Sequence, residues 1–300
     1  MGGLEGPPKP PDARDVPAKP GRPSILGVLN PGAMGSAVGA ALRAGGTRVL
    51  WTSEGRSPAT RKRAESAGLE DARTVSALVA ASQIVLSVCP PESAVDVARD
   101  VMTKKFAGVY VDANAVAPAT AREIAAIVEQ GGATYVDGGI VGPPPKTRGT
   151  TRLYLSGVQA DRVAALFAAG ALEAIVVDGK VGAASALKMA YASWTKGSQA
   201  LLMAVRAFAI AEGVDDGLLE EWRRSQPDLP RRSEQAVQGT SPKAWRFVGE
   251  MDEIAAAFAE ADLPSGFHQA AAEIYRRLAE YKDTTQPPSV AEAADKLRGR

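Results

Sequence analysis

Two groups of residues in this sequence have the types and spacing that chemistry requires. The first is the turn Asn30-Pro31-Gly32-Ala33-Met34-Gly35, which follows a short apolar run and precedes a helical stretch. The second is Lys188, which lies on a long and mostly apolar helical stretch. A glycine-rich turn of this kind can bind nucleotide phosphates, and a partly buried lysine can transfer protons. The pair points to a nucleotide site with acid–base chemistry.

The turn is close to a dinucleotide fingerprint. In that motif one glycine lets the backbone approach the pyrophosphate, and another lets the helix pack on the strand. Gly32 and Gly35 have the spacing for these roles, and Asn30 stands at the first glycine's position, where we expect it to adopt the left-handed conformation that asparagine tolerates. A strand–helix turn without a ligand is the alternative. The predicted cofactor contacts here are Leu29, Asn30, Pro31, Gly32, Ala33, Met34 and Gly35.

The segment after the second apolar run bears on the choice of nicotinamide cofactor. An NAD site has an acidic side chain there for the ribose hydroxyls, whereas an NADP site offers hydroxyls and arginine to the 2′-phosphate. Ser53, Arg56 and Ser57 suit the phosphate, and Arg61 lies one helical turn further. Glu54 is the contrary sign, although it lies one residue beyond the position expected for a ribose-binding acid. The segment favours NADP over NAD.

Lys188 belongs to a polar stripe on an otherwise apolar helix. Ser185, Tyr191 and Thr195 share its face by their spacing. Such a stripe predicts a lined cavity, in which burial lowers the pKa of a lysine and suits it to general acid or base catalysis. A lysine that packs its stem at an interface and keeps its ammonium in water is the alternative.

Short apolar runs alternate with helical stretches in the first part of the chain. This alternation predicts βαβ units in a doubly wound parallel sheet, a Rossmann-type α/β fold. The predicted strands are Ile25–Leu29, Val49–Thr52, Ile84–Val88, Val109–Val111, Thr134–Val136, Arg152–Ser156 and Ala174–Val177. The predicted helices between them are Ser36–Arg43, Ser57–Ala67, Pro91–Val101, Ala117–Glu129 and Asp161–Ala168.

The strand signals stop at Gly182, and helical patterns follow. The predicted helices are Ala183–Glu212, Asp216–Arg224, Lys243–Ala261, Pro264–Tyr281 and Val290–Leu297. We therefore expect three parts: a flexible Pro- and Gly-rich tail at 1–23, a dinucleotide-binding domain at 24–181, and an all-helical domain at 182–300.

Composition excludes several classes of protein. The 300 residues carry a net charge of +1, so the broad basic field of a nucleic-acid binder is missing. One cysteine and one histidine rule out a disulfide framework and a Cys/His metal cluster, so we expect no metal. No apolar stretch is long enough for a transmembrane helix, and the N-terminus lacks the apolar core of a signal peptide. We expect a cytoplasmic protein without a membrane or nucleic-acid partner.

Four segments, in this order, resemble the β-hydroxyacid dehydrogenase and 6-phosphogluconate dehydrogenase-like superfamily, which includes NADPH-dependent imine reductases. Gly27–Gly35 is similar to its nucleotide fingerprint, Asp112–Pro118 to a segment beside the nicotinamide, Asp137–Pro143 to its substrate-binding loop, and Gly182–Ala192 to its lysine motif. The closest likeness is to a subgroup whose helical C-terminal domain has no assigned function. The resemblance implies a homodimer formed through the helical domain.

The resemblance also implies roles for single residues. Lys188 matches the lysine that passes a proton to or from the substrate oxygen. Val141 and Pro143 stand where the family has a serine and a glycine, and Tyr191 and Ala192 where it has two asparagines. We therefore expect a less polar pocket in which Tyr191 helps to orient the substrate. The remaining predicted contacts are Asn114, Val141, Gly142, Ser185 and His268 for substrate, and Cys89, Pro90, Asn114 and Ala115 for cofactor.

These residues support one leading hypothesis and two alternatives. The first is an NADP-dependent oxidoreductase that transfers hydride between NADP(H) and a carbonyl or alcohol, with Lys188 as general acid/base. The second is an NADPH-dependent imine reductase that uses Tyr191 as proton donor, and the third is a catalytically silent, NADP-binding regulatory protein. Cys89 is expected to be an inert packed thiol, and Trp194 and Trp245 core or interface residues.

Overall fold

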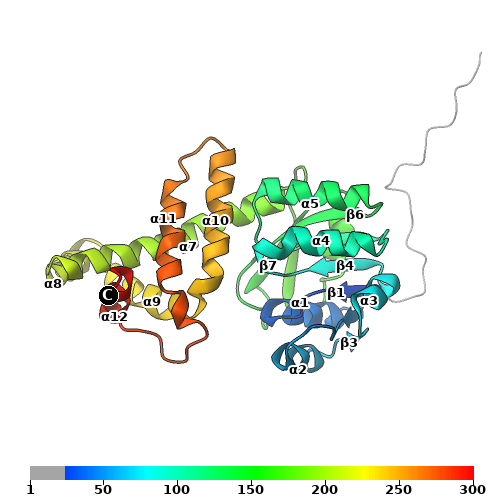
Figure 1. Ribbon diagram of the computed structural model, residues 1–300, viewed down its shortest axis with the longest axis horizontal. Helices are drawn as coiled ribbons and strands as arrows, with labels where there is room; N and C mark the ends of the chain where they lie inside the picture. The colour runs from blue at the N-terminus through cyan, green and yellow to red at the C-terminus, as the bar shows by residue number, and fades with distance from the viewer. Residues whose placement is uncertain (1–23) are drawn as a thin grey trace, which may run out of the picture.

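The computed structural model describes residues 24–300, so the predicted tail at 1–23 lies outside the described residues. A sheet of eight strands, in the order β3-β2-β1-β4-β5-β6-β7-β8, forms one part of the molecule (Figure 1). The strands are β1 Ile25–Val28, β2 Arg48–Trp51, β3 Glu70–Asp71, β4 Ile84–Ser87, β5 Val109–Asp112, β6 Thr134–Val141, β7 Thr151–Ser156 and β8 Leu172–Val176.

Helices cover both faces of this sheet, as the doubly wound pattern predicts. One face packs against α1 Ala33–Ala44, α2 Pro58–Ser66 and α6 Ala160–Ala165. The other packs against α3 Val75–Ala81, α4 Ala94–Thr103 and α5 Pro118–Gln130. The central strands β1, β4 and β5 are almost entirely buried, which explains why they are continuous apolar runs in the sequence.

The sheet departs from the predicted parallel arrangement at one pair of strands. All neighbouring strands are parallel except β6 and β7, which are antiparallel, with Gly139 opposite Tyr154. The connection at 142–150 is too short for the helical crossover that a parallel pair needs, so the chain must turn back on itself. The prediction of a doubly wound, mostly parallel sheet is therefore confirmed, and the prediction of parallel strands is wrong only for β6 and β7.

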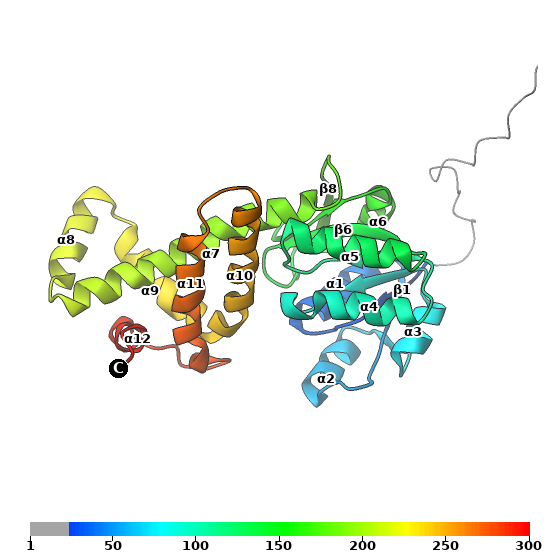
Figure 2. The same cartoon turned by 45° about the horizontal axis from the view of Figure 1, so that its top comes forward.

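The second part of the molecule is built around one long helix. Figure 2 shows α7 (Ala183–Ala211) extending from the sheet to α8 (Asp215–Ser225), with α10 (Ala244–Glu260) and α11 (Gly266–Arg277) side by side across it. The remaining helices are α9 Leu229–Thr240 and α12 Val290–Leu297. Many of the buried positions between these helices are alanines, which let helix axes approach closely. No helix within 24–300 combines the length and apolarity needed to cross a membrane.

Three elements were not foreseen in the sequence. The strand β3 has two exposed acidic residues, so it carries no apolar signal. The helix α3 is short and depends on Thr74, whose side chain accepts a hydrogen bond from the Ala77 N–H. The helix α9 has Pro230 in its first turn, where proline is tolerated because that N–H needs no partner.

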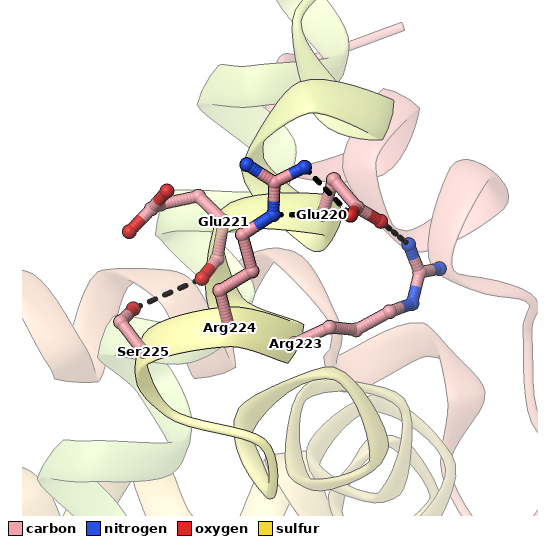
Figure 3. A network of polar contacts seen from close by, with 5 residues as sticks. All are labelled: Glu220, Glu221, Arg223, Arg224 and Ser225. Carbon is pink, nitrogen blue, oxygen red and sulfur yellow. Dashed lines mark hydrogen bonds and ion pairs between the residues drawn. The ribbon is translucent and has the colours of Figure 1, made fainter.

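Near the C-terminal end of α7, one arginine is buried and two others are exposed. Arg206, which interrupts the longest apolar stretch, is buried, and its guanidinium donates to both carboxylate oxygens of Asp215 and to Ser233 Oγ. It thereby ties α7 to α8 and α9. Arg223 and Arg224 on α8 instead share the exposed Glu220 carboxylate (Figure 3), and such surface pairs add little stability.

Candidate active site

A cleft of about 870 Å³ lies between the carboxyl ends of the sheet strands and the helix α10. The sheet side contributes the turn Gly32–Gly35, the residues that follow β4 and β5, and Ile140. The helical side contributes Lys188 and the first turns of α10. The carboxyl edge of a parallel sheet is where ligands of this fold class bind, and the volume suits a cofactor with a small substrate.

The glycine turn has the geometry that a dinucleotide phosphate requires. A Cβ on Gly35 would collide with the Asn30 carbonyl, so only glycine lets α1 start this close to β1. A Cβ on Gly32 would meet nothing within 4 Å, so this side of the turn is open to the cleft. The helix α1 begins at Gly32 without a side-chain cap, which leaves N–H groups of its first turn free for an anion. These residues fit the pyrophosphate of a dinucleotide.

The expected left-handed conformation at Asn30 is wrong. The left-handed residues other than glycine within 24–300 are Arg73, Lys105, Asp262 and Asp283. The turn is instead closed by the Gly32 N–H, which donates to the Asn30 carbonyl at 2.8 Å. Asn30 faces a smaller neighbouring cavity of about 320 Å³.

The residues predicted to bind the 2′-phosphate do not all line the same cavity. Ser57 lines the main cleft, together with Thr60 and Arg63, which the sequence argument did not include. Arg56 lies in the smaller cavity and donates to the Leu29 carbonyl at 2.9 Å. Ser53 lines neither of these two cavities.

Glu54, the acidic residue that favoured NAD over NADP in the sequence, does not line the cleft. Glu54 accepts a hydrogen bond from the Val75 N–H at 3.0 Å and thereby binds the start of α3. Because this carboxylate is engaged there and does not line the cleft, it is not placed to bind a ribose hydroxyl.

Lys188 lines the cleft and is mostly buried. Its side chain is 13% exposed, and burial lowers its pKa to about 8, with a further lowering from Lys196 that Glu250 opposes. It reaches this place because Gly139 on β6 lets α7 approach: a Cβ there would stand 2.8 Å from the Cβ of Lys188. The segment predicted as a substrate loop is therefore partly strand β6, and its Gly139 admits the helix that carries the lysine.

Two partners of Lys188 were missed by sequence reasoning. Glu250 on α10 places Oε2 4.0 Å from Lys188 Nζ and 2.7 Å from Lys196 Nζ. Lys196 lies on the same helix as Lys188, so a search for charged residues along α7 could have found it. Glu250 comes from a different helix, and its neighbourhood depends on how α10 packs against α7.

The start of α7 is anchored by a buried carboxylate. Asp137 on β6 accepts hydrogen bonds from the N–H groups of Gly182 and Ser185 and from the hydroxyls of Ser156 and Ser185. Ser185 is fully buried in this network, so its predicted role in substrate binding is wrong. A carboxylate at a helix N-terminus also interacts favourably with the helix dipole.

Three other predicted substrate residues, and Tyr191, which was predicted to be catalytic, do not line the cleft. Val141 is buried in β6, and Gly142 starts the turn to β7. Tyr191 is 48% exposed on the outside of α7, so the predicted polar stripe does not line one cavity. His268 is buried with its ring 4.2 Å from that of Phe258, and burial lowers its pKa.

The predicted cofactor residues beyond β4 and β5 do line the cleft: they are Cys89, Pro90, Asn114 and Ala115. The Asn114 amide is used internally, since Oδ1 accepts from the Cys89 N–H and Nδ2 donates to Ser87 Oγ. These two hydrogen bonds fix the ends of β4 and β5 relative to each other. Burial raises the pKa of Cys89 to about 11, which is consistent with an inert thiol. Trp245, which was expected in the core or at an interface, lines the cleft instead.

Comparison with known proteins agrees with this geometry. Residues 26–179 match the family described as the NAD binding domain of 6-phosphogluconate dehydrogenase, and residues 209–278 match a domain of unknown function, DUF1932. An uncharacterised 28.5 kDa protein of Methanothermus fervidus is 35% identical over 167 residues, which cover 56% of this chain and 64% of that protein. The match thus spans less than two thirds of the relative's length.

Solved structures align with most of the chain. A conserved protein of unknown function, described as structurally similar to 3-hydroxyacid dehydrogenases, is 27% identical with a TM-score of 0.66, over 86% of this chain and 97% of that one. A 3-hydroxyisobutyrate dehydrogenase of Mycobacterium tuberculosis is 18% identical with a TM-score of 0.69, over 92% of this chain and 100% of that one. A reductive aminase of Aspergillus terreus, solved with NADPH and ethyl levulinate, is 19% identical with a TM-score of 0.54, over 92% of this chain and 100% of that one.

The last two likenesses concern the fold alone, whereas the family match covers half of the chain and includes the glycine turn and the strand ends that form the cleft. The chain belongs to the family that carries the NAD binding domain of 6-phosphogluconate dehydrogenase.

Proposed function

We propose that the protein is an NADP-dependent oxidoreductase that transfers hydride between NADP(H) and a carbonyl or alcohol substrate, with Lys188 as the general acid/base. The observation that carries the proposal is the position of Lys188, a buried lysine in the same cleft as the glycine turn. With a pKa lowered to about 8, this lysine exists in both protonation states near neutral pH, as a proton carrier must.

The chain's own groups supply binding, orientation and the proton. The first turn of α1 binds the pyrophosphate, and Ser57, Thr60 and Arg63 bind the 2′-phosphate. NADPH, when bound, supplies the hydride. In the direction of reduction the Lys188 ammonium donates a proton to the substrate oxygen, and in the direction of oxidation the neutral amine accepts it. Ile140 and Trp245 line the cleft with apolar surface and exclude water.

A charge placed on α2 tests the cofactor assignment. Ser57→Asp keeps an oxygen to cap α2, because aspartate is as good an N-cap as serine, but adds a carboxylate to the cleft. We expect NADPH to bind about tenfold more weakly, a cost of about 1.4 kcal/mol, while NADH affinity stays the same. Calorimetric titration of both cofactors measures this difference.

Thr74→Asp is the matched control, since Thr74 caps α3 in the same way and does not line the cleft. Equal weakening of NADPH and NADH by Ser57→Asp would contradict the 2′-phosphate assignment. If neither cofactor raises the melting temperature of the unmodified protein, the nucleotide site itself is refuted.

Carbonyl chemistry is the better supported of the two reaction classes. The likeness to a reductive aminase motivates imine reduction, but Tyr191, the donor expected for it, lies outside the cleft of its own chain, whereas Lys188 lies within it. A screen of aldehydes, ketones and cyclic imines with NADPH distinguishes them. Turnover of imines alone would favour the alternative, and stabilisation by NADPH without any turnover would favour a regulatory protein.

We also propose that a second copy of the chain packs on α7. Four large apolar side chains on this helix are between 48% and 69% exposed: Tyr191, Trp194, Leu201 and Phe208. Trp194, Leu201 and Phe208 follow Tyr191 by 3, 10 and 17 residues, a spacing that puts all four on one face of the helix. In a two-fold dimer this face of one chain packs against the same face of the other chain. Such a dimer would bury Tyr191.

Trp194→Lys tests this interface. A charge at Trp194, the most exposed of the four side chains, is expected to shift the protein from dimer to monomer, as measured by sedimentation velocity at micromolar concentration. Val158→Lys, which replaces another exposed apolar residue on the sheet part, should leave the dimer intact. A monomer in the unmodified protein would contradict the proposal directly.

A further inference from the structure

Two lysines and one glutamate are buried together between α7 and α10. Glu250 Oε2 is 2.7 Å from Lys196 Nζ and 4.0 Å from Lys188 Nζ, and the three side chains are 17%, 12% and 13% exposed. With one carboxylate for two ammonium groups, the cluster carries one net positive charge in a place with little water. Burial and like-charge repulsion then both favour the release of one proton.

The surroundings decide which lysine releases it. Lys196 has the shorter contact with Glu250, and its ammonium lies 4.9 Å from the centre of the Phe247 ring, an arrangement that favours a cation. Lys188 has the longer contact and lines the cleft. The longer contact with Glu250 and the position in the cleft single out Lys188 as the lysine that can exchange a proton with a substrate.

Other charged groups near the cluster leave this division intact. Burial acts to raise the pKa of Glu250, but Lys196, Lys188 and, least of all, Arg246 on α10 lower it, and the net effect is a lowered pKa. Tyr275 on α11 donates its hydroxyl to the Lys196 backbone carbonyl, and Asp137 on β6 is occupied at the start of α7. Within residues 24–300, no carboxylate lies nearer to the Lys188 ammonium than Glu250 does.

We propose that Glu250 and Lys196 are positioning residues: their ion pair holds a carboxylate near Lys188 without giving it a close partner. Lys188 is thus kept ready to exchange a proton with the substrate oxygen. The inference rests on the proposed function of Lys188. It also implies that the cleft favours a reacting oxygen that gains negative charge, since the cluster leaves one positive charge uncompensated.

The titration of Lys188 itself tests the arrangement. In protein labelled with ¹³C at the lysine ε-carbon, the Lys188 signal is assigned by its loss in Lys188→Met, and its midpoint is read from the shift against pH. Lys196→Met frees Glu250 to pair with Lys188, so we expect the midpoint to rise by about one pH unit. Among the described residues, Glu250 is the acid paired with Lys188, so Glu250→Gln removes that negative charge and we expect the midpoint to fall by about one unit.

Two variants control for indirect effects. Lys196→Arg keeps the positive charge and should leave the Lys188 midpoint nearly unchanged, even if Lys196→Met destabilises the fold. Glu280→Gln removes the carboxylate of the exposed Lys296–Glu280 ion pair and should also have no effect. Shifts of the same sign in Lys196→Met and Glu250→Gln, or no shift in either, would overturn the proposal.

The titration needs neither cofactor nor substrate, so the two proposals can fail separately. If the midpoints move as expected but Lys188→Met keeps its turnover, the cluster exists and the proposed catalytic role is wrong. If Lys188→Met loses turnover but the midpoints do not move, Lys188 is catalytic and the positioning role of Glu250 and Lys196 is wrong.

Discussion

Replacing Lys188 with methionine is expected to lower kcat/KM by about 10²- to 10⁴-fold, the usual contribution of a general acid or base. Methionine keeps the length and the apolar stem of the side chain, so the packing of α7 against β6 should survive. NADPH affinity should change by less than about twofold, because the residues proposed to bind its phosphates lie at the starts of α1 and α2. Steady-state kinetics on an accepted carbonyl substrate, with a calorimetric titration of NADPH, measure both quantities.

The pattern of loss separates a proton carrier from a binding residue. A fall in kcat identifies an interaction made in the transition state, whereas a rise in KM at constant kcat identifies ground-state binding only. Lys180→Met is the matched control, because Lys180 is exposed just before α7 and does not line the cleft. Unchanged turnover in Lys188→Met would remove the lysine from the mechanism.

Replacing Asp137 with alanine is expected to lower the free energy of unfolding by about 3 kcal/mol, since it leaves several buried donors without an acceptor. The donors are the N–H groups of Gly182 and Ser185 and the hydroxyls of Ser156 and Ser185. Because the same bonds hold the start of α7, we also expect a loss of turnover. Urea denaturation followed by circular dichroism measures the loss of stability.

Asp178→Ala provides the comparison for this prediction. Asp178 is exposed in the same connection between β8 and α7, so its removal should change stability by less than about 0.5 kcal/mol. If Asp137→Ala unfolds at the same urea concentration as Asp178→Ala, the carboxylate does not anchor the helix. The fold would then depend on packing between α7 and β6 alone.

The sequence was sufficient wherever one local pattern decides the outcome. Buried parallel strands must be apolar throughout, so β1, β4 and β5 are visible as runs, and the glycine turn is visible from its place between a strand and a helix. Lys188 could be identified because a lysine on an apolar helix is unusual. By contrast, the prediction that the polar stripe around Lys188 lines one cavity was wrong. The spacing shows which residues share a face of the helix, but it does not show which other elements pack against each part of that face.

The partners of Lys188 depend on contacts between distant segments. Glu250 is 62 residues further along the chain, and nothing near it in the sequence distinguishes it from an exposed helix residue. The role of Gly139 was hidden in the same way, because its lack of a side chain is explained only by the approach of α7. Such positions are fixed by docking of elements, which periodicity does not encode.

The helix α7 has a consequence for how the molecule unfolds. Its first turns are packed on β6 and bound to Asp137, while its later turns form the centre of the helical part, where Arg206 binds α8 and α9. The two parts are therefore joined by one continuous helix that each of them needs for its own core. Melting of either part removes support from the other, so heat should unfold them in a single cooperative transition, where a flexible linker would allow two.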